Sequence, residues 1–230
     1  MLRVLLIAGH GDGDPGAVAL GYQEADLTRE LVQNIKAELS PYCEVDIADM
    51  SLNMYRYIIK HGNYFNFKHY DYVIEVHFNA CEEEKNGNGV TKGVEIYVTR
   101  DEKTVSVEDN IVKGINTLGF KNRGVKRKNF DLIAHIKRQG VSSALLEACF
   151  IDDKDDMTLY QSCKKAFAKK VAEGIAKGYE LDTLSSACKV LYDAGIINSP
   201  EYWAKGGGYS DSNTVLLIKK FADYVKRKEM

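Results

Sequence analysis

Short apolar segments alternate with amphipathic helical patterns over residues 1–182, and this alternation leaves few folds open. The segment 2–8, apolar except for Arg3, leads directly into a glycine-rich turn, which is typical of a buried parallel strand. Residues 24–39 place an aliphatic side chain at every fourth position, which predicts a helix ending before Pro41. Further strands are expected at 43–49, 72–78, 93–99 and 142–147, and further helices at 51–64, 105–118 and 156–179. Strands separated by helices predict an α/β fold with an open, mostly parallel sheet flanked by helices on both faces.

The residues after Asp182 follow a different pattern. Short amphipathic helices are expected between Leu184 and Ala194, after a Ser199-Pro200 cap, and over 214–228. Gly206–Gly208 would form a flexible break between the last two. We therefore expect one α/β domain over residues 1–180 and a small all-helical C-terminal module over residues 183–230.

Composition excludes several classes of protein. Lysine and arginine number 31 against 33 aspartates and glutamates, so charge gives no reason to expect nucleic acid as a partner. The longest aliphatic run, Val4–Ala8, is far too short to span a bilayer, so no membrane association is expected. The first residues lack the features of a signal peptide, and five cysteines without a pairing pattern fit a reducing compartment. We expect a protein synthesised in the cytoplasm.

Residues able to carry chemistry fall at the ends of the expected strands. His10 follows the first strand, His77 lies near the end of 72–78, and Glu147 ends 142–147. Ligands of an open parallel sheet bind at the carboxyl ends of its strands, so these side chains should meet at one edge. Glu24 opens a helix above that edge, on its inward face, where an unpaired carboxylate would be costly.

Two histidines and one carboxylate form a suitable ligand set for a catalytic zinc, which leaves a fourth position for water. A further carboxylate can carry the proton from water to a leaving amine. Glu147 is the candidate, because its apolar strand neighbours would raise its pKa. Each residue also has an ordinary interpretation. His10 could simply be a residue of the turn, Glu24 could be an acidic residue that interacts with the positive end of the helix dipole, and the side chain of Glu147 could reach solvent.

Four segments carry a family resemblance. They are Gly9–Gly11 with Asp14–Ala17, Glu24, Val76–Ala80 and Leu145–Ile151. In order, spacing and flanking residues, residues 1 to about 180 resemble the zinc-dependent N-acetylmuramoyl-L-alanine amidases, which include autolysins and phage endolysins. The resemblance implies that His10, Glu24 and His77 bind Zn²⁺ and that Glu147 is the catalytic acid/base. The implied reaction is hydrolysis of the amide between the lactyl group of N-acetylmuramic acid and L-alanine.

Two positions depart from the family pattern. Glu75 replaces a small hydroxyl residue and shares a strand face with His77. It could support the metal ligands, add a charge near zinc, or be a paired structural carboxylate, and we favour the last. Cys149 replaces a glycine on the face of Glu147 and could approach the metal, although a small buried thiol is the favoured interpretation.

Substrate contacts are expected from Asn79, just beyond its strand, and from Arg123 and Lys126 in a basic segment before the last strand. A turn asparagine and a solvated loop are the alternatives. Trp203 in the C-terminal module could bind carbohydrate, but pinning the short helices together is favoured. The module itself could bind the cell wall or mediate homo-oligomerisation.

The hypothesis is therefore a peptidoglycan amidase, in particular a phage or prophage endolysin that lacks a signal peptide and acts on the bacterial cell wall after release. Two alternatives stay open. One is a zinc peptidase that cuts within the stem peptide, and the other is a cell-wall-binding module without catalytic activity. The presence of all four expected site residues argues against the second alternative.

Overall fold

A six-stranded sheet in the order β4-β1-β5-β8-β6-β7 forms the centre of this computed structural model. Its first four strands run parallel, namely β4 (Glu44–Ile47), β1 (Arg3–Ala8), β5 (Tyr72–Asn79) and β8 (Ser142–Phe150). Strand β6 (Val94–Val98) is antiparallel to β8, and β7 (Asn122–Arg127) is parallel to β6. The predicted mostly parallel sheet is confirmed. Because β6 and β7 are reversed, their first residues lie at the edge where the other strands end.

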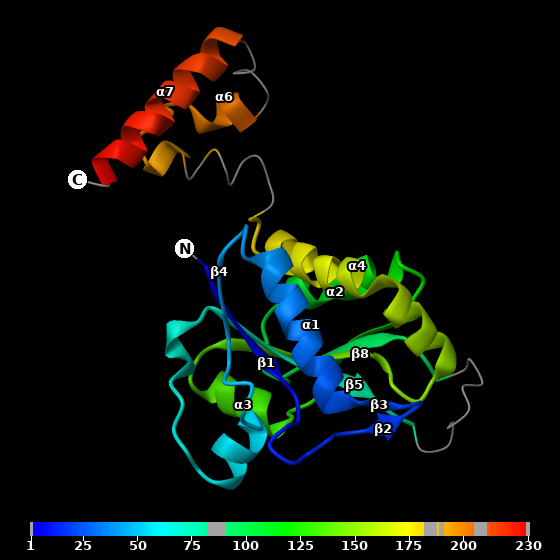
Figure 1. The fold of residues 1–230 in the computed structure, drawn as a ribbon. Coiled ribbons are helices and arrows are strands. Elements are labelled where there is room, and N and C mark those ends of the chain that lie inside the picture. The colour runs from blue at the N-terminus through cyan, green and yellow to red at the C-terminus, as the bar shows by residue number, and fades with distance from the viewer. Residues whose placement is uncertain (1, 82–90, 182–187, 189–190, 205–210, 229–230) are drawn as a thin grey trace. The chain divides into compact units, whose positions relative to one another are not determined.

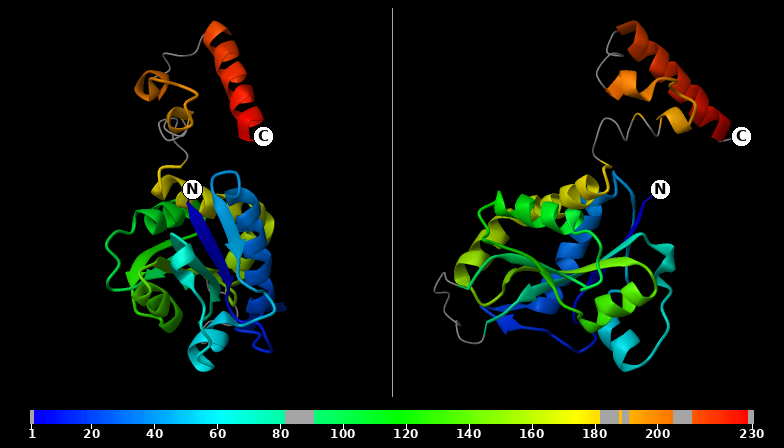
Figure 2. Two further views of the ribbon diagram at one scale, coloured as in Figure 1. Left: turned by 90° about the vertical axis from the view of Figure 1, so that its left-hand side faces the viewer. Right: turned by 180° about the vertical axis from the view of Figure 1, so that it is seen from behind.

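Helices cover both faces of this sheet. Figures 1 and 2 show α1 (Glu24–Leu39), α2 (Ser106–Asn116) and α4 (Lys154–Gly178) on one face and α3 (Asp131–Arg138) on the other. The alternation of β1 explains how both faces are filled. Leu5 and Ile7 pack with Leu132 and Ile136 of α3 in one buried cluster. Val4 and Leu6 alternate with them along the strand, so they point to the opposite face, where they are also buried.

Several predicted elements need correction. The segment 51–64 is not one regular helix: Met54 and Tyr55 begin a short helical turn, which continues as the π-helix Arg56–Lys60. Asn53 caps this turn, because its side-chain oxygen accepts the backbone N–H of Arg56 at 3.0 Å. The basic segment expected as a loop is the edge strand β7. Helix α3 and the hairpin of β2 (Val18–Ala19) and β3 (Tyr22–Gln23) were not predicted.

Two strands also extend further than expected. Strand β5 includes Asn79, which the sequence placed beyond the strand end. Strand β8 continues to Phe150, so Glu147 lies within it and not at its last position. The aromatic and aliphatic residues that follow Glu147 are buried, which explains why the chain keeps its extended form through them.

The structure describes residues 2–81, 91–181, 188, 191–204 and 211–228. Its contacts divide the chain into two units, Met1–Tyr179 and Glu180–Met230. The second unit contains α6 (Pro200–Ala204) and α7 (Asp211–Lys228), whereas most of the helix expected before Ala194 and the Gly206–Gly208 break lie outside the described residues. Trp203 packs against a buried cluster of Cys188, Ile196 and Ile197. None of the described helices is long and apolar enough to cross a membrane.

Candidate active site

The turn after β1 holds His10 in an unusual backbone conformation. Its φ of 60° lies in the left-handed region, which costs energy for a residue with a Cβ atom. The His10 Nδ1 atom lies 3.1 Å from Asp14 Oδ2, within the same turn. Gly9 and Gly16 make this approach possible, because an added Cβ would collide with the His77 ring at Gly9 and with the His10 ring at Gly16. The backbone of this turn therefore packs closely against the imidazole rings of His10 and His77.

Glu24 is the first residue of α1 and is 3% exposed. Its carboxylate is held by backbone donors from two other segments. Its Oε2 atom accepts the N–H of Ala17 at 2.9 Å, and its Oε1 atom accepts the N–H of Phe78 at 3.0 Å. These two bonds fix the orientation of the Glu24 carboxylate at the edge of the sheet where β1 and β5 end, although α1 lies on the face of the sheet opposite α3.

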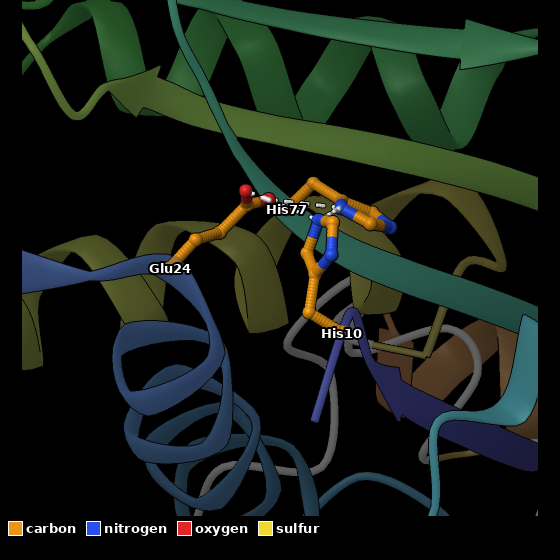
Figure 3. A group of neighbouring side chains, drawn as sticks. All are labelled: His10, Glu24 and His77. Atoms are coloured by element: carbon orange, nitrogen blue, oxygen red, sulfur yellow. Dashed lines mark hydrogen bonds and ion pairs between the residues drawn. The ribbon is translucent and has the colours of Figure 1, made fainter. Parts of the chain in front are cut away.

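His10, Glu24 and His77 form one cluster (Figure 3). The His77 Nδ1 atom lies 3.2 Å from His10 Nε2 and 2.9 Å from Glu24 Oε1. The His10 Nε2 atom lies 3.1 Å from Glu24 Oε2. Zinc bonds of about 2.0 Å at tetrahedral angles would separate neighbouring ligand atoms by about 3.3 Å. The spacing and the chemistry of these three groups therefore fit a single metal ion.

Electrostatics in the cluster are strongly coupled. Burial lowers the pKa of His77, but the carboxylates of Glu75 and Glu24 outweigh burial and hold that pKa well above its usual value. The pKa of His10 is raised as well, since Glu24 and Asp14 outweigh its burial. Burial raises the pKa of Glu24, but the two histidines bring it far below the ordinary value. Protonation of the two histidines is therefore favoured in the metal-free cluster, and a metal ion would compete with these protons.

Glu147 faces this cluster from the neighbouring strand. It is paired in register with His77, so both side chains point to the α3 face. Burial raises its pKa to about 7 despite the opposing effect of His77, and its Oε2 atom has no hydrogen-bond partner among the described residues. The cavity in front of these groups is lined by His10, Asp14, Asn53, Tyr55, Glu75, His77, Phe130, Asp131, Leu132, Leu145 and Glu147.

The raised pKa of Glu147 predicts a pH-dependent cost to stability. An unfolded glutamate ionises near pH 4.5, whereas the folded one keeps its proton to about pH 7, so the native state loses stability as the pH rises through this window. Glu147→Gln removes that loss. In the metal-free protein its free energy of unfolding, relative to wild type, should increase by about 3 kcal/mol from pH 4.5 to pH 7.5. Urea unfolding at the two pH values measures the change, and a pH-independent difference would contradict it.

The three predicted substrate-binding residues converge on a residue that the sequence analysis missed. The Asn79 side chain donates to Glu95 Oε1 at 2.9 Å. The Arg123 Nε atom and the Lys126 ammonium group both contact Glu95 Oε2. Glu95 is 2% exposed and is paired in register with Glu147, so this polar cluster lies beside the cavity on the same face of the sheet.

The two departures from the family pattern occupy different surroundings. The Oε1 atom of Glu75 lies 3.1 Å from His77 Nε2, at the side of the ring turned away from Glu24. Cys149 is fully buried, and burial raises the pKa of its thiol well above the usual value. It is not part of the three-residue cluster that could hold a metal. His61, His69 and His135 are likewise not members of that cluster.

Fold and site together define a class: open α/β proteins with a candidate metal centre at the carboxyl edge of the sheet, faced by a buried carboxyl group. Residues 4–179 match the family described as N-acetylmuramoyl-L-alanine amidase, and the chain belongs to this family. The chain is 29% identical over 180 residues to an endolysin of Bacillus phage SPP1, covering 76% of this chain and 64% of the relative. It is 28% identical to a probable autolysin of Staphylococcus aureus, over 75% of this chain and 38% of that protein.

Solved structures show the same fold. The catalytic domain of an endolysin targeting Clostridia difficile superimposes with a TM-score of 0.62 at 22% identity, covering 77% of this chain and 98% of that domain. The catalytic domain of an amidase from Bacillus (Paenibacillus) polymyxa gives a TM-score of 0.62 at 19% identity, covering 79% and 100%. The chain thus spans under two thirds of the endolysin and autolysin relatives, but almost all of these catalytic domains.

Proposed function

We propose that this protein is a zinc-dependent peptidoglycan hydrolase that cleaves the amide between the lactyl group of N-acetylmuramic acid and L-alanine. The observation that carries the proposal is the cluster of His10, Glu24 and His77 with Glu147 facing it. Family membership supports the choice of bond. The relative from phage SPP1 is named an endolysin, and we propose the same role for this chain, lysis of the bacterial cell wall after release from the cell that makes it.

Zinc is the proposed cofactor, with His10, Glu24 and His77 as its ligands. Three protein ligands of nitrogen and oxygen type with an open position are the usual set of a catalytic zinc. When bound there, zinc supplies Lewis-acid activation of water and of the scissile carbonyl. The backbone donors to Glu24 and the Asp14 carboxylate beside His10 orient these two ligands before an ion binds.

Glu147 is the proposed acid/base. Its carboxylate accepts a proton from the attacking water and then returns it to the nitrogen of L-alanine as the carbon–nitrogen bond breaks. The products are a lactyl carboxylate and a free amino terminus. Without a metal, burial raises the pKa of this carboxyl group to about 7. An adjacent dication would lower that pKa and favour the ionised form, which accepts the proton from water.

We propose that Asn79, Arg123 and Lys126 contact the peptide stem, with Glu95 fixing their positions. Stem carboxylates are natural partners for the two cations. Arg123→Ala should raise KM for a soluble muramyl peptide about tenfold and leave kcat within about twofold, since one charge-assisted contact contributes at least about 1.4 kcal/mol. Lys113→Ala, which removes an exposed charge on α2, is the control. An unchanged KM in Arg123→Ala would contradict the assignment.

The C-terminal unit is proposed to anchor the enzyme to the cell wall or to mediate self-association. It has its own buried cluster, and Tyr202 and Phe221 are about half exposed. Deleting residues 180–230 tests both roles, by co-sedimentation with purified walls and by the mass in solution. We expect at least one of the two to change, and neither changing would contradict the proposal.

The products of digestion test the proposed reaction. Mass spectrometry of material released from purified walls should find intact stem peptides without sugar and glycan strands with free lactyl groups. Stem peptides that stay on the sugar, with only their distal residues released, would contradict the choice of bond.

A further inference from the structure

Glu75 occupies a position that the reaction proposed above does not use. Strand alternation puts it on the same face as His77, two residues away. Its Oε1 atom lies 3.1 Å from His77 Nε2, whereas the Nδ1 atom across the same ring faces Glu24 and His10. The imidazole of His77 therefore bridges two different environments, a lone carboxylate on one side and the metal-binding cluster on the other.

The surroundings of Glu75 restrict it to this contact. It is 4% exposed, and its register neighbours are Ile7 on β1 and Leu145 on β8. Among the described residues, the hydrogen bonds and ion pairs of its side chain go to His77 alone. A buried carboxylate without a partner would be costly, so this interaction should persist whether or not the cluster holds an ion.

We propose that Glu75 is a positioning residue for the metal centre: it accepts the Nε2 proton of His77 and thereby keeps the Nδ1 lone pair directed at the ion. A neutral imidazole carries one N–H, and an ionised carboxylate can only accept. Glu75 therefore selects the tautomer in which Nδ1 is the ligand. The inference rests on the proposed function, since it assumes that His77 binds zinc.

The other histidine shows the same arrangement, which supports the inference. His10 directs Nε2 into the cluster, and its Nδ1 atom lies 3.1 Å from Asp14 Oδ2. Each imidazole thus has a carboxylate on the nitrogen turned away from Glu24. Such partners of metal-bound histidines fix ring orientation and raise ligand basicity, and losing one typically weakens metal binding about 10–100-fold.

Zinc affinity of the full-length chain tests this role. The metal-free wild type, Glu75→Gln and Glu75→Ala are titrated with Zn²⁺ against a chromophoric chelator. We expect Glu75→Ala to bind zinc about 10–100-fold more weakly. Glu75→Gln, which keeps an acceptor oxygen without the charge, should lose less. Glu147→Gln is the matched control, because it replaces a buried carboxyl group beside His77 that makes no hydrogen bond to the ring among the described residues.

A direct readout of the tautomer completes the test. Nitrogen-15 NMR of the zinc-loaded wild type should find the His77 proton on Nε2. Equal zinc affinity in wild type and both Glu75 variants, or a proton on Nδ1, would overturn the inference while leaving the metal site intact. A wild type that binds no zinc would overturn the metal site and the inference together. If Glu75→Ala fails to fold, the comparison of Glu75→Gln with Glu147→Gln decides, and equal losses would count against the role.

Discussion

Glu147→Gln is expected to lower the rate of amide hydrolysis about a thousandfold while zinc still binds with a stoichiometry of one. The substitution keeps the shape of the side chain but removes the group that accepts a proton from water and gives it to the leaving nitrogen. The structure favours a large effect, because Glu147 faces the cluster and its Oε2 atom has no hydrogen-bond partner in the part of the chain that the structure describes. Release of muramyl-free peptide measures the rate, and metal analysis of the purified protein measures zinc.

The matched control is Glu108→Gln. Glu108 is also a buried glutamate whose pKa is raised by burial, but it accepts a hydrogen bond from Tyr72 at 2.7 Å and belongs to α2. Its replacement should leave hydrolysis unchanged. A wild-type rate in Glu147→Gln would remove Glu147 from the reaction, and loss of zinc together with activity would instead make it part of the metal site.

His77→Ala is expected to abolish both stoichiometric zinc binding and hydrolysis. Its Nδ1 atom lies close to both His10 and Glu24, so the substitution leaves only two of the three proposed metal ligands. Zinc at a hundred times its Kd should stabilise the wild type by about 2.7 kcal/mol. The same zinc concentration should leave the melting temperature of His77→Ala unchanged.

Thermal melts with and without zinc measure this difference, and His61→Ala provides the control. His61 is exposed and follows the π-helix Arg56–Lys60, outside the cluster. Its replacement should keep the full zinc-dependent shift in melting temperature. A His77→Ala protein that is still stabilised by zinc would place the metal elsewhere in the chain.

The elements whose sequences have a strong periodicity could be predicted from the sequence. The apolar run of β1 and the regular spacing in α1 indicated the correct elements, and the helix bounds Glu24–Leu39 are confirmed. Because parallel strands end at one edge, the sequence also indicated that His10 and His77 would meet. In the structure the Nε2 atom of His10 and the Nδ1 atom of His77 lie 3.2 Å apart. Their role as zinc ligands stays a prediction.

Other elements carry weak local signals. Strand β7 has the sequence Asn-Arg-Gly-Val-Lys-Arg, which lacks an apolar face because it lies at the sheet edge. Helix α3 is only eight residues long, and its periodicity is too short to stand out. The reversal of β6 depends on which strands pair, which no local pattern specifies. Because β7 has no apolar face, the basic segment was expected to be a loop.

Glu95 could have been found from the sequence. Residues 94–98 alternate so that Val94, Ile96 and Val98 are buried on one face, which leaves Glu95 and Tyr97 together on the other. A glutamate within such a strand indicates a partner of opposite charge. The partners themselves could not be identified, because Arg123 and Lys126 lie on a strand whose pairing appears only in the fold.

The decisive measurement is the identity of the amino termini that appear when the protein digests purified peptidoglycan, with and without a zinc chelator. If the protein is the proposed amidase, labelling will find new N-terminal L-alanine, and chelation will abolish it. New termini at another residue of the stem would contradict this and indicate a peptidase. No new termini on a panel of cell walls, with zinc bound to the protein, would contradict catalysis and indicate a wall-binding module.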